Sequence, residues 1–162
     1  MTGKSHAVDS SRSRQATTYA NPDGTQTTIL STEPVNYRDS HGTWRAIQPD
    51  LRATSTGDLT AIGGGTPAEL AQHADSGQLA QLSVDATHRV SWRMQTRSHS
   101  KAVVSGSSAH YRNVGADSDL ELKPQAAGLK ETIVLRSRQA ATRYKFALSL
   151  TGLRAQVSGA GV

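Results

Sequence analysis

The sequence contains no cysteine and few large apolar residues. Without cysteine there can be neither a disulfide framework nor a thiolate zinc site, but the compartment stays open because many exported proteins also lack cysteine. Leucine, isoleucine, valine and phenylalanine together number 28 of the 162 residues. That share is below the roughly one fifth that separates globular from disordered compositions, so we expect a compact part accompanied by disordered segments.

Aromatic residues are also scarce: two tryptophans, four tyrosines and one phenylalanine. A chain this poor in apolar side chains needs its aromatic residues in the core, where each buries a large area. No segment approaches the roughly 18 apolar residues of a membrane-spanning helix, so no membrane span is predicted. The first 14 residues also lack the apolar segment of a signal peptide, so either the chain is not exported or its export signal lies outside the given sequence.

Positive charge exceeds negative charge, with a net charge of +5 and a calculated pI of 9.9. This balance favours anionic partners such as cell-wall polymers or acidic surfaces, although the charges are spread too thinly to predict a nucleic-acid partner. Arg89 and Arg93 lie at strand spacing and therefore share one face. An arginine-bearing face of this kind is typical of the solvent-exposed side of a sheet. The alternative interpretation is that it binds a polyanion.

Two turn motifs organise the first third of the chain, Asn21-Pro22-Asp23-Gly24 and Asp39-Ser40-His41-Gly42. Each begins with a side chain that can bond to its own backbone and ends with glycine, which tolerates the left-handed conformation. The motifs predict two β-hairpins, one joining residues 15–20 to 25–32 and the other joining 35–38 to 43–47.

In the second hairpin, alternation predicts that Tyr37 and Trp44 share one apolar face. One interpretation makes them cross-strand partners in the core, and the scarcity of aromatic residues favours it. The other makes them a platform on which a sugar or a base stacks.

Alternating apolar and polar residues continue through the second half of the chain. The pattern predicts strands at 79–84, 88–94, 102–105, 109–114, 119–123, 129–135 and 142–150. Within 88–94, Trp92 faces the core together with its apolar neighbours, whereas Arg89 and Arg93 face outwards. We therefore predict an all-β fold, an antiparallel sandwich or barrel-like sheet of about 8–11 short strands.

The remaining segments define the expected domain organisation. Residues 1–14 are predicted to be a disordered leader, 15–157 a single β-rich domain, and 158–162 a disordered end. A glycine-rich stretch predicts a flexible loop over 52–66. Thr66-Pro67-Ala68-Glu69 resembles a helix-capping box and predicts a short helix near 67–74.

No arrangement of residues predicts catalysis. The six histidines are scattered without metal-ligand spacing, and no Gly-x-Ser-x-Gly motif marks a nucleophile. Asp117 and Asp119 are spaced like turn-forming acids beside a strand. We predict no catalytic, cofactor or metal residues and no enzymatic activity, and the candidate ligand or interface contacts are Tyr37, Trp44, Trp92, Arg89 and Arg93.

Three segments occur in an order that resembles a known family: YANPDGTQTTILSTEPVNYRDSHGTWRAIQPDL, then HYRNVGADSDLELKPQAAGLKETIVLRSR, then TRYKFALSLTGL. They resemble the N-terminal β-rich region of large secreted bacterial proteins of the RHS and YD-repeat class, which includes polymorphic toxins and wall-associated proteins with DNRLRE-type domains. The residues at the family's motif positions are Tyr19, Asp23, Gly24, Tyr37, Asp39, Gly42, Trp44, Tyr111, Val114, Asp119, Gly128, Lys130, Glu131, Phe146 and Gly152.

The sequence also departs from that family. Gln48 stands where the family usually has aspartate, residues 52–77 have no counterpart, and the YD repeats and the toxin domain are absent. The resemblance therefore implies the scaffold end of a secreted or wall-associated system, without toxic activity.

Two functions follow as hypotheses. The first is a non-catalytic structural or interaction module that pairs its sheet edges with the remainder of a larger RHS-like chain or with its assembly partners. The second is a surface module that binds cell-wall glycan or another polyanion through arginine and tryptophan.

Overall fold

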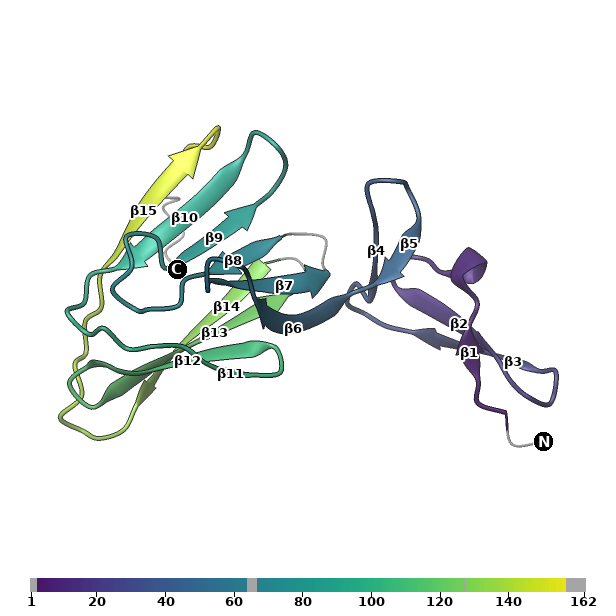
Figure 1. Cartoon of the computed structure of the whole chain (residues 1–162), viewed down its shortest axis with the longest axis horizontal. Helices are drawn as coiled ribbons and strands as arrows, with labels where there is room; N and C mark the ends of the chain where they lie inside the picture. The colour runs from purple at the N-terminus through teal and green to yellow at the C-terminus, as the bar shows by residue number, and fades with distance from the viewer. Residues whose placement is uncertain (1–2, 64–66, 127, 157–162) are drawn as a thin grey trace.

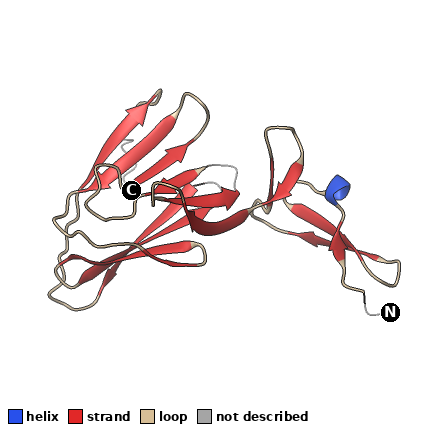
Figure 2. Cartoon of the chain, viewed as in Figure 1, coloured by secondary structure: helices blue, strands red, loops and turns tan. Residues whose placement is uncertain are grey.

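The computed structural model describes residues 3–63, 67–126 and 128–156, and these residues form an all-β protein (Figure 2). A single 3-10 turn, η1 (Asp9–Ser11), is the only helical element among them. The described residues form fifteen strands, more than the 8–11 expected, because the sequence pattern did not predict four of them, at 6–7, 48–53, 59–63 and 68–70. All strand pairs are antiparallel.

The N-terminal region consists of two small sheets, which lie on the right in Figure 1. The first has the order β1-β2-β3, and the second is the hairpin β4-β5. Their strands are β1 (His6–Ala7), β2 (Ala16–Ala20), β3 (Gln26–Leu30), β4 (Asn36–Arg38) and β5 (Trp44–Ala46). Both predicted hairpins are confirmed, because β2 pairs with β3 and β4 pairs with β5.

The rest of the chain forms a β-sandwich of two sheets that are not closed into a barrel (Figure 1). A six-stranded sheet has the order β15-β10-β9-β8-β7-β6 and faces a four-stranded sheet with the order β11-β12-β13-β14. The strands are β6 (Gln48–Ala53), β7 (Leu59–Gly63), β8 (Ala68–Leu70), β9 (Ala80–Ser83), β10 (Arg89–Met94), β11 (Val103–Ser105), β12 (Ser108–Gly115), β13 (Ser118–Gln125), β14 (Gly128–Leu135) and β15 (Phe146–Thr151).

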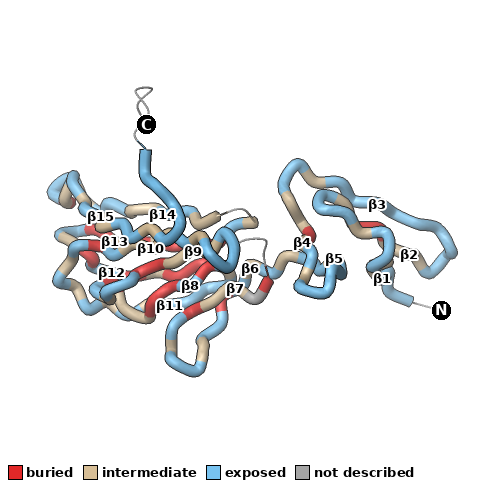
Figure 3. Tube along the Cα trace, turned by 90° about the horizontal axis from the view of Figure 1, so that it is seen from above, coloured by how far each residue is buried: buried red, intermediate tan, exposed pale blue. Residues whose placement is uncertain are grey.

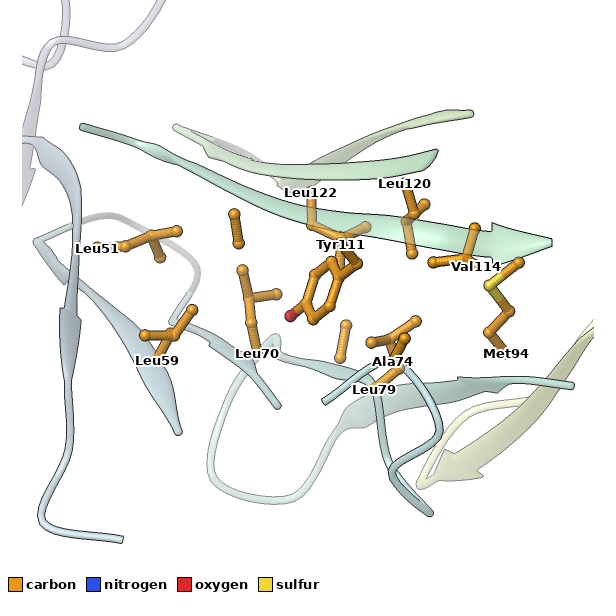
Figure 4. Packing of buried hydrophobic residues seen from close by; sticks show 12 residues of the cluster. Leu51, Leu59, Leu70, Ala74, Leu79, Met94, Tyr111, Val114, Leu120 and Leu122 are labelled. Atoms are coloured by element: carbon orange, nitrogen blue, oxygen red, sulfur yellow. The ribbon is translucent and has the colours of Figure 1, made fainter. Parts of the chain in front are cut away.

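The apolar core lies between the two sheets of the sandwich (Figure 4). Leu70 from one sheet and Leu122 from the other are almost completely buried. Tyr111 of β12 lies between them, and its hydroxyl donates a hydrogen bond of 2.6 Å to the carbonyl of Ala71. Burial raises the pKa of Tyr111 far above its ordinary value, so the group remains a neutral donor. This bond gives the only polar atom of that side chain a partner inside the core.

One turn design recurs three times. In the segments 21–25, 39–43 and 54–58, the first residue's N–H donates to the last residue's carbonyl at 2.7–2.9 Å. The fourth residue is always a glycine with positive φ: Gly24 at 84°, Gly42 at 76° and Gly57 at 91°. The third turn joins β6 to β7, so the flexible loop predicted over 52–66 is wrong for the residues described there. The third turn has the sequence Thr-Ser-Thr-Gly, which favours the same kind of turn but less strongly than a turn that begins with asparagine or aspartate.

The predicted helix near 67–74 is also wrong. Ala68 and Leu70 are buried and Glu69 between them is exposed, which is the alternation of a strand. β8 is the fourth of six strands in its sheet, so both of its edges are paired and its backbone groups are satisfied there. Three residues are too few for the period of two to be recognised in the sequence.

The predicted termini differ as well. Within the leader expected to be disordered, β1 pairs with β2, with His6 opposite Ala20 and Ala7 opposite Tyr19. The strand predicted over 142–150 begins at Phe146. The predicted disordered end, 158–162, lies outside the described residues.

Candidate functional site

A buried asparagine holds the N-terminal sheets together. Asn36 of β4 is only 1% exposed, and its Nδ2 donates to the carbonyls of Ser13 and Ala16 at 2.8 and 2.9 Å. Its Oδ1 accepts a 2.7 Å bond from Arg12 Nη1. Arg12 also pairs with Asp9 at 2.8 Å, which lowers the pKa of that carboxyl. Nothing in the sequence pattern distinguishes Asn36, because asparagine is more often exposed.

The β4–β5 register separates the two aromatic residues that were expected on one face. Tyr37 lies opposite Arg45, and Trp44 lies opposite Arg38. Residues directly opposite each other share a face, so Tyr37 and Trp44 point to opposite sides of the hairpin. The prediction of a shared face is wrong because the turn at 39–43 contains one residue more than a two-residue loop. One extra residue moves every side chain of the second strand to the other face.

Each aromatic residue has its own surroundings. The Tyr37 ring packs against Gly63 of β7, a strand of the sandwich. The contact is so close that a Cβ atom at position 63 would lie 3.3 Å from the ring. Trp44 is half-buried, and the guanidinium carbon of Arg38 lies 4.9 Å from the centre of its ring. This is within the range of a cation–π contact, which is strongest for tryptophan.

A hollow of about 250 Å³ lies beside Trp44, where the N-terminal sheets meet the β13–β14 turn of the sandwich. We call it the Trp44 hollow. Tyr37 and Trp44 both contribute to its lining, although they point to opposite sides of the hairpin, and so do two arginines that were not predicted. Its lining consists of Arg14, Pro34, Asn36, Tyr37, Arg38, Trp44, Ile47 and Ala126.

The two arginines of the hollow have no acidic partner. Arg14 and Arg38 are exposed, and neither makes an ion pair or a side-chain hydrogen bond within residues 3–63, 67–126 and 128–156. The nearby carboxylate of Asp39 is engaged elsewhere, by the Thr43 N–H at 2.9 Å and by Arg45 at 3.1 Å. These bonds lower the pKa of Asp39. The hollow therefore carries two uncompensated positive charges.

The other predicted contact residues lie on β10 and do not join this site (Figure 1). As predicted, Trp92 faces inwards, where its Nε1 donates to Glu131 of β14 at 3.1 Å. Burial raises the pKa of Glu131, and the tryptophan bond opposes the shift. Arg89 and Arg93 are exposed on the outer face. The five candidate residues are thus divided between two separate places.

Two aspartate–histidine pairs resemble fragments of a catalytic triad. His88 Nδ1 lies 2.7 Å from Asp85, and His99 Nδ1 lies 3.0 Å from Asp75. A triad also needs a nucleophile bonded to the far ring nitrogen, and no such bond occurs among the described residues. The far nitrogen of His88 instead packs near the backbone of Gly152. Asp85 and His88 form a capped turn between β9 and β10.

Of the eight edge strands among the described residues, β3 and β15 are the two that are uncharged and longer than three residues. Both strands are uncharged, and Leu30 of β3 and Leu148 of β15 are 78% and 60% exposed. Leu148 lies opposite the half-buried Trp92, so it belongs to the inner face of the sandwich and yet is uncovered. We call these two strands the open edges.

The other edges of the sandwich carry features that discourage pairing. β6 contains Pro49 and a register shift, β14 carries Lys130 and Glu131, and β11 has only three residues. Proline, charge, irregularity and short length are the usual means by which proteins protect their edges.

Two further features are absent from the described part of the chain. No group of three or more His, Asp or Glu side chains there could hold a metal ion. None of its helical segments is long and apolar enough to cross a membrane.

The geometry therefore offers two surfaces, the open edges and the Trp44 hollow. No protein-family model, no curated protein and no solved structure matches this chain.

Proposed function

We propose that this chain is a non-catalytic interaction module of a larger secreted RHS-like bacterial protein, and that it joins the rest of that protein by strand pairing at its open edges. The observation that carries the proposal is the contrast between edges. β3 and β15 are uncharged and exposed, whereas the other edges of the sandwich are interrupted, charged or very short. An unprotected edge presents unpaired N–H and C=O groups to an incoming strand.

The backbone groups that would receive a strand on β3 follow from its ladder. Asn21 N–H bonds to Thr25 and Ser31 N–H bonds to Gln15, so every second residue from Thr25 to Ser31 bonds inwards to β2. The intervening N–H groups, including that of Leu30, therefore point to the open side.

The same reasoning applies to β15. Gln95 N–H bonds to the carbonyl of Lys145, and Arg93 lies opposite Ala147 in the same register. Inward bonds therefore fall on the odd-numbered residues of this strand, and the N–H of Leu148 points outwards. Leu148 combines an outward N–H with an uncovered inner-face side chain.

The experiment is a binding assay between this chain and a YD-repeat segment of an RHS protein from the bacterium that encodes it. Leu30→Pro and Leu148→Pro each remove one outward N–H without touching the existing ladder. Leu30→Thr and Leu148→Thr are the matched controls, since they shorten the same side chains but keep the N–H and the strand preference.

We expect the double proline variant to weaken binding by about tenfold or more, and the double threonine variant to weaken it by no more than about threefold. Hydrogen exchange of the complex should show new protection at β3 or β15. Absence of binding, or equal binding by the proline and threonine variants, would contradict the proposal.

A second candidate function is binding of a cell-wall glycan or another polyanion at the bacterial surface. The observation in its favour is the pair of arginines without acidic partners beside Trp44. A salt-sensitive association with purified cell wall, weakened by Trp44→Ala in a folded protein, is the expected result.

A further inference from the structure

The Trp44 hollow combines an aromatic ring, apolar walls and two guanidinium groups. Pro34 and Ile47 provide the apolar wall on the N-terminal side, and Ala126 provides it on the sandwich side. Sites for small ligands are typically of this kind, mostly apolar with a few polar groups that fix orientation.

The amide of Asn36 also lines the hollow but is not available to a ligand. Its Nδ2 donates to two backbone carbonyls, those of Ser13 and Ala16, and its Oδ1 accepts from Arg12. The charged groups left to meet a ligand are the guanidinium groups of Arg14 and Arg38. Both groups only donate hydrogen bonds and are always charged, so the ligand must offer acceptor oxygens and negative charge.

Contacts within the N-terminal sheets place both arginine residues at the hollow. The carbonyl of Arg14 accepts the N–H groups of Val35 and Asn36 at 2.9 and 3.2 Å, which joins its segment to the start of β4. Arg38 is the last residue of β4, and its guanidinium lies over the Trp44 ring. Two like charges beside one hollow repel each other, and an anion between them would remove that repulsion.

The size of the hollow limits the ligand. At about 250 Å³ it is smaller than the roughly 300–1,000 Å³ of typical ligand sites, so it suits one ring with one anionic group. Nucleic-acid channels use a row of stacking aromatic residues along a charged groove. Here a single indole faces the hollow, since Trp92 lies on β10 and bonds to Glu131.

We infer that the Trp44 hollow binds an anionic saccharide unit, with its phosphate or carboxylate between Arg14 and Arg38 and its ring against Trp44. The inference deepens the second candidate function and does not depend on strand pairing at the open edges. Phosphate diesters and carboxylates share the same chemistry towards arginine, since both offer oxygens for charge-assisted hydrogen bonds.

Isothermal titration with four probes tests the inference: phosphomannan, a polysaccharide that carries phosphate diesters, polygalacturonate, neutral dextran and single-stranded DNA. The test variant is Arg14→Gln with Arg38→Gln. Its matched control is Arg89→Gln with Arg93→Gln, which removes the same charge from the exposed outer face of β10. Thermal unfolding of both variants should match that of the unaltered chain, since all four side chains are exposed.

We expect one of the two anionic polysaccharides to bind and dextran not to bind. The hollow variant should weaken binding by about tenfold or more, and the control by no more than about twofold. Phosphate and carboxylate sources are distinguished by which polymer binds more tightly.

Three results would overturn the inference: no binding of either anionic polysaccharide, an equal loss in the hollow and control variants, or tighter binding of single-stranded DNA. The variant with Leu30→Pro and Leu148→Pro should retain polymer binding. Loss of polymer binding therefore tests the Trp44 hollow alone, and loss of binding to the YD-repeat segment tests the open edges alone.

Discussion

The N-terminal sheets and the sandwich are stabilised in different ways. In the described part of the chain, every buried apolar residue belongs to the sandwich, where Leu70, Tyr111 and Leu122 fill the space between two sheets. In the described residues before β6, the buried residues are all polar, namely Thr17, Thr18 and Asn36. Figure 3 shows the same contrast, with buried segments gathered in the sandwich and only short ones in the N-terminal region.

A chain with few apolar residues thus supports more than one structured region. The apolar residues are concentrated in one core, where burial contributes stability in proportion to area. The N-terminal sheets instead rely on hydrogen bonds around Asn36, which are specific but contribute little net free energy each. They should therefore open more readily than the sandwich.

The largest expected effect is in the sandwich. Leu122→Ala removes a side chain with 0% exposure and should lower the free energy of unfolding by about 3–5 kcal/mol. Urea denaturation measures the change. Val134→Ala on the outer face of β14, 44% exposed, is the control and should cost no more than about 1 kcal/mol. Equal losses would show that the two sheets do not enclose the core.

The next effect is confined to the N-terminal region. Asn36→Ala removes the amide that donates to the carbonyls of Ser13 and Ala16 and accepts from Arg12. We expect a local loss of about 2–4 kcal/mol, measured as faster hydrogen exchange of β2 amides while exchange around Tyr111 stays unchanged. Asn36→Asp keeps the acceptor for Arg12 but turns a carboxylate oxygen towards the carbonyls of Ser13 and Ala16, so it should not restore the lost stability. Equal acceleration of hydrogen exchange in the N-terminal sheets and in the sandwich would contradict the idea that the two regions are stabilised separately.

A smaller effect is expected at Trp44, because its ring is half-buried. Trp44→Ala should lower the free energy of unfolding by about 1–2 kcal/mol and leave the near-ultraviolet circular dichroism of the sandwich unchanged. A loss of about 3–5 kcal/mol with global unfolding would instead restore the interpretation of Trp44 as a core residue.

The smallest effect concerns Glu131. Its pKa in the folded protein is raised above the ordinary value of 4.5, so ionisation weakens the fold. Stability should fall as pH rises from about 4.5 through the folded pKa. Glu131→Gln keeps an acceptor for Trp92 and should abolish this slope, with a gain at pH 7 of only about 0.5 kcal/mol because solvent screens the group. A slope that persists in the variant would assign it to another group.

Much of the fold could be predicted from local signals. The period-two pattern of Val90, Trp92 and Met94 predicts β10 and its buried face, and this is confirmed. The two turns that begin at Asn21 and Asp39 are confirmed with a left-handed glycine in each. These features depend on neighbouring residues, and the physical rules for alternation and turns act over the same short range.

The helix near 67–74 shows where local signals fail. A capping-box sequence favours a helix, but pairing on both sides within a six-stranded sheet satisfies the backbone of β8 instead. The flexible loop predicted over 52–66 is wrong for a related reason. Its glycine belongs to a tight turn between two strands, and pairing of β6 with β7 gives the turn its shape.

Almost none of the candidate site could be predicted from the sequence. Aromatic composition draws attention to Trp44, but one additional residue in its turn places it away from Tyr37 and beside Arg38. Arg14 joins them because its backbone bonds to the start of β4, a contact between distant positions. Alternation and turn chemistry therefore predict strands, turns and which side chains each strand exposes. Register and sheet pairing set which of those side chains meet, because these depend on contacts that no short stretch of sequence contains.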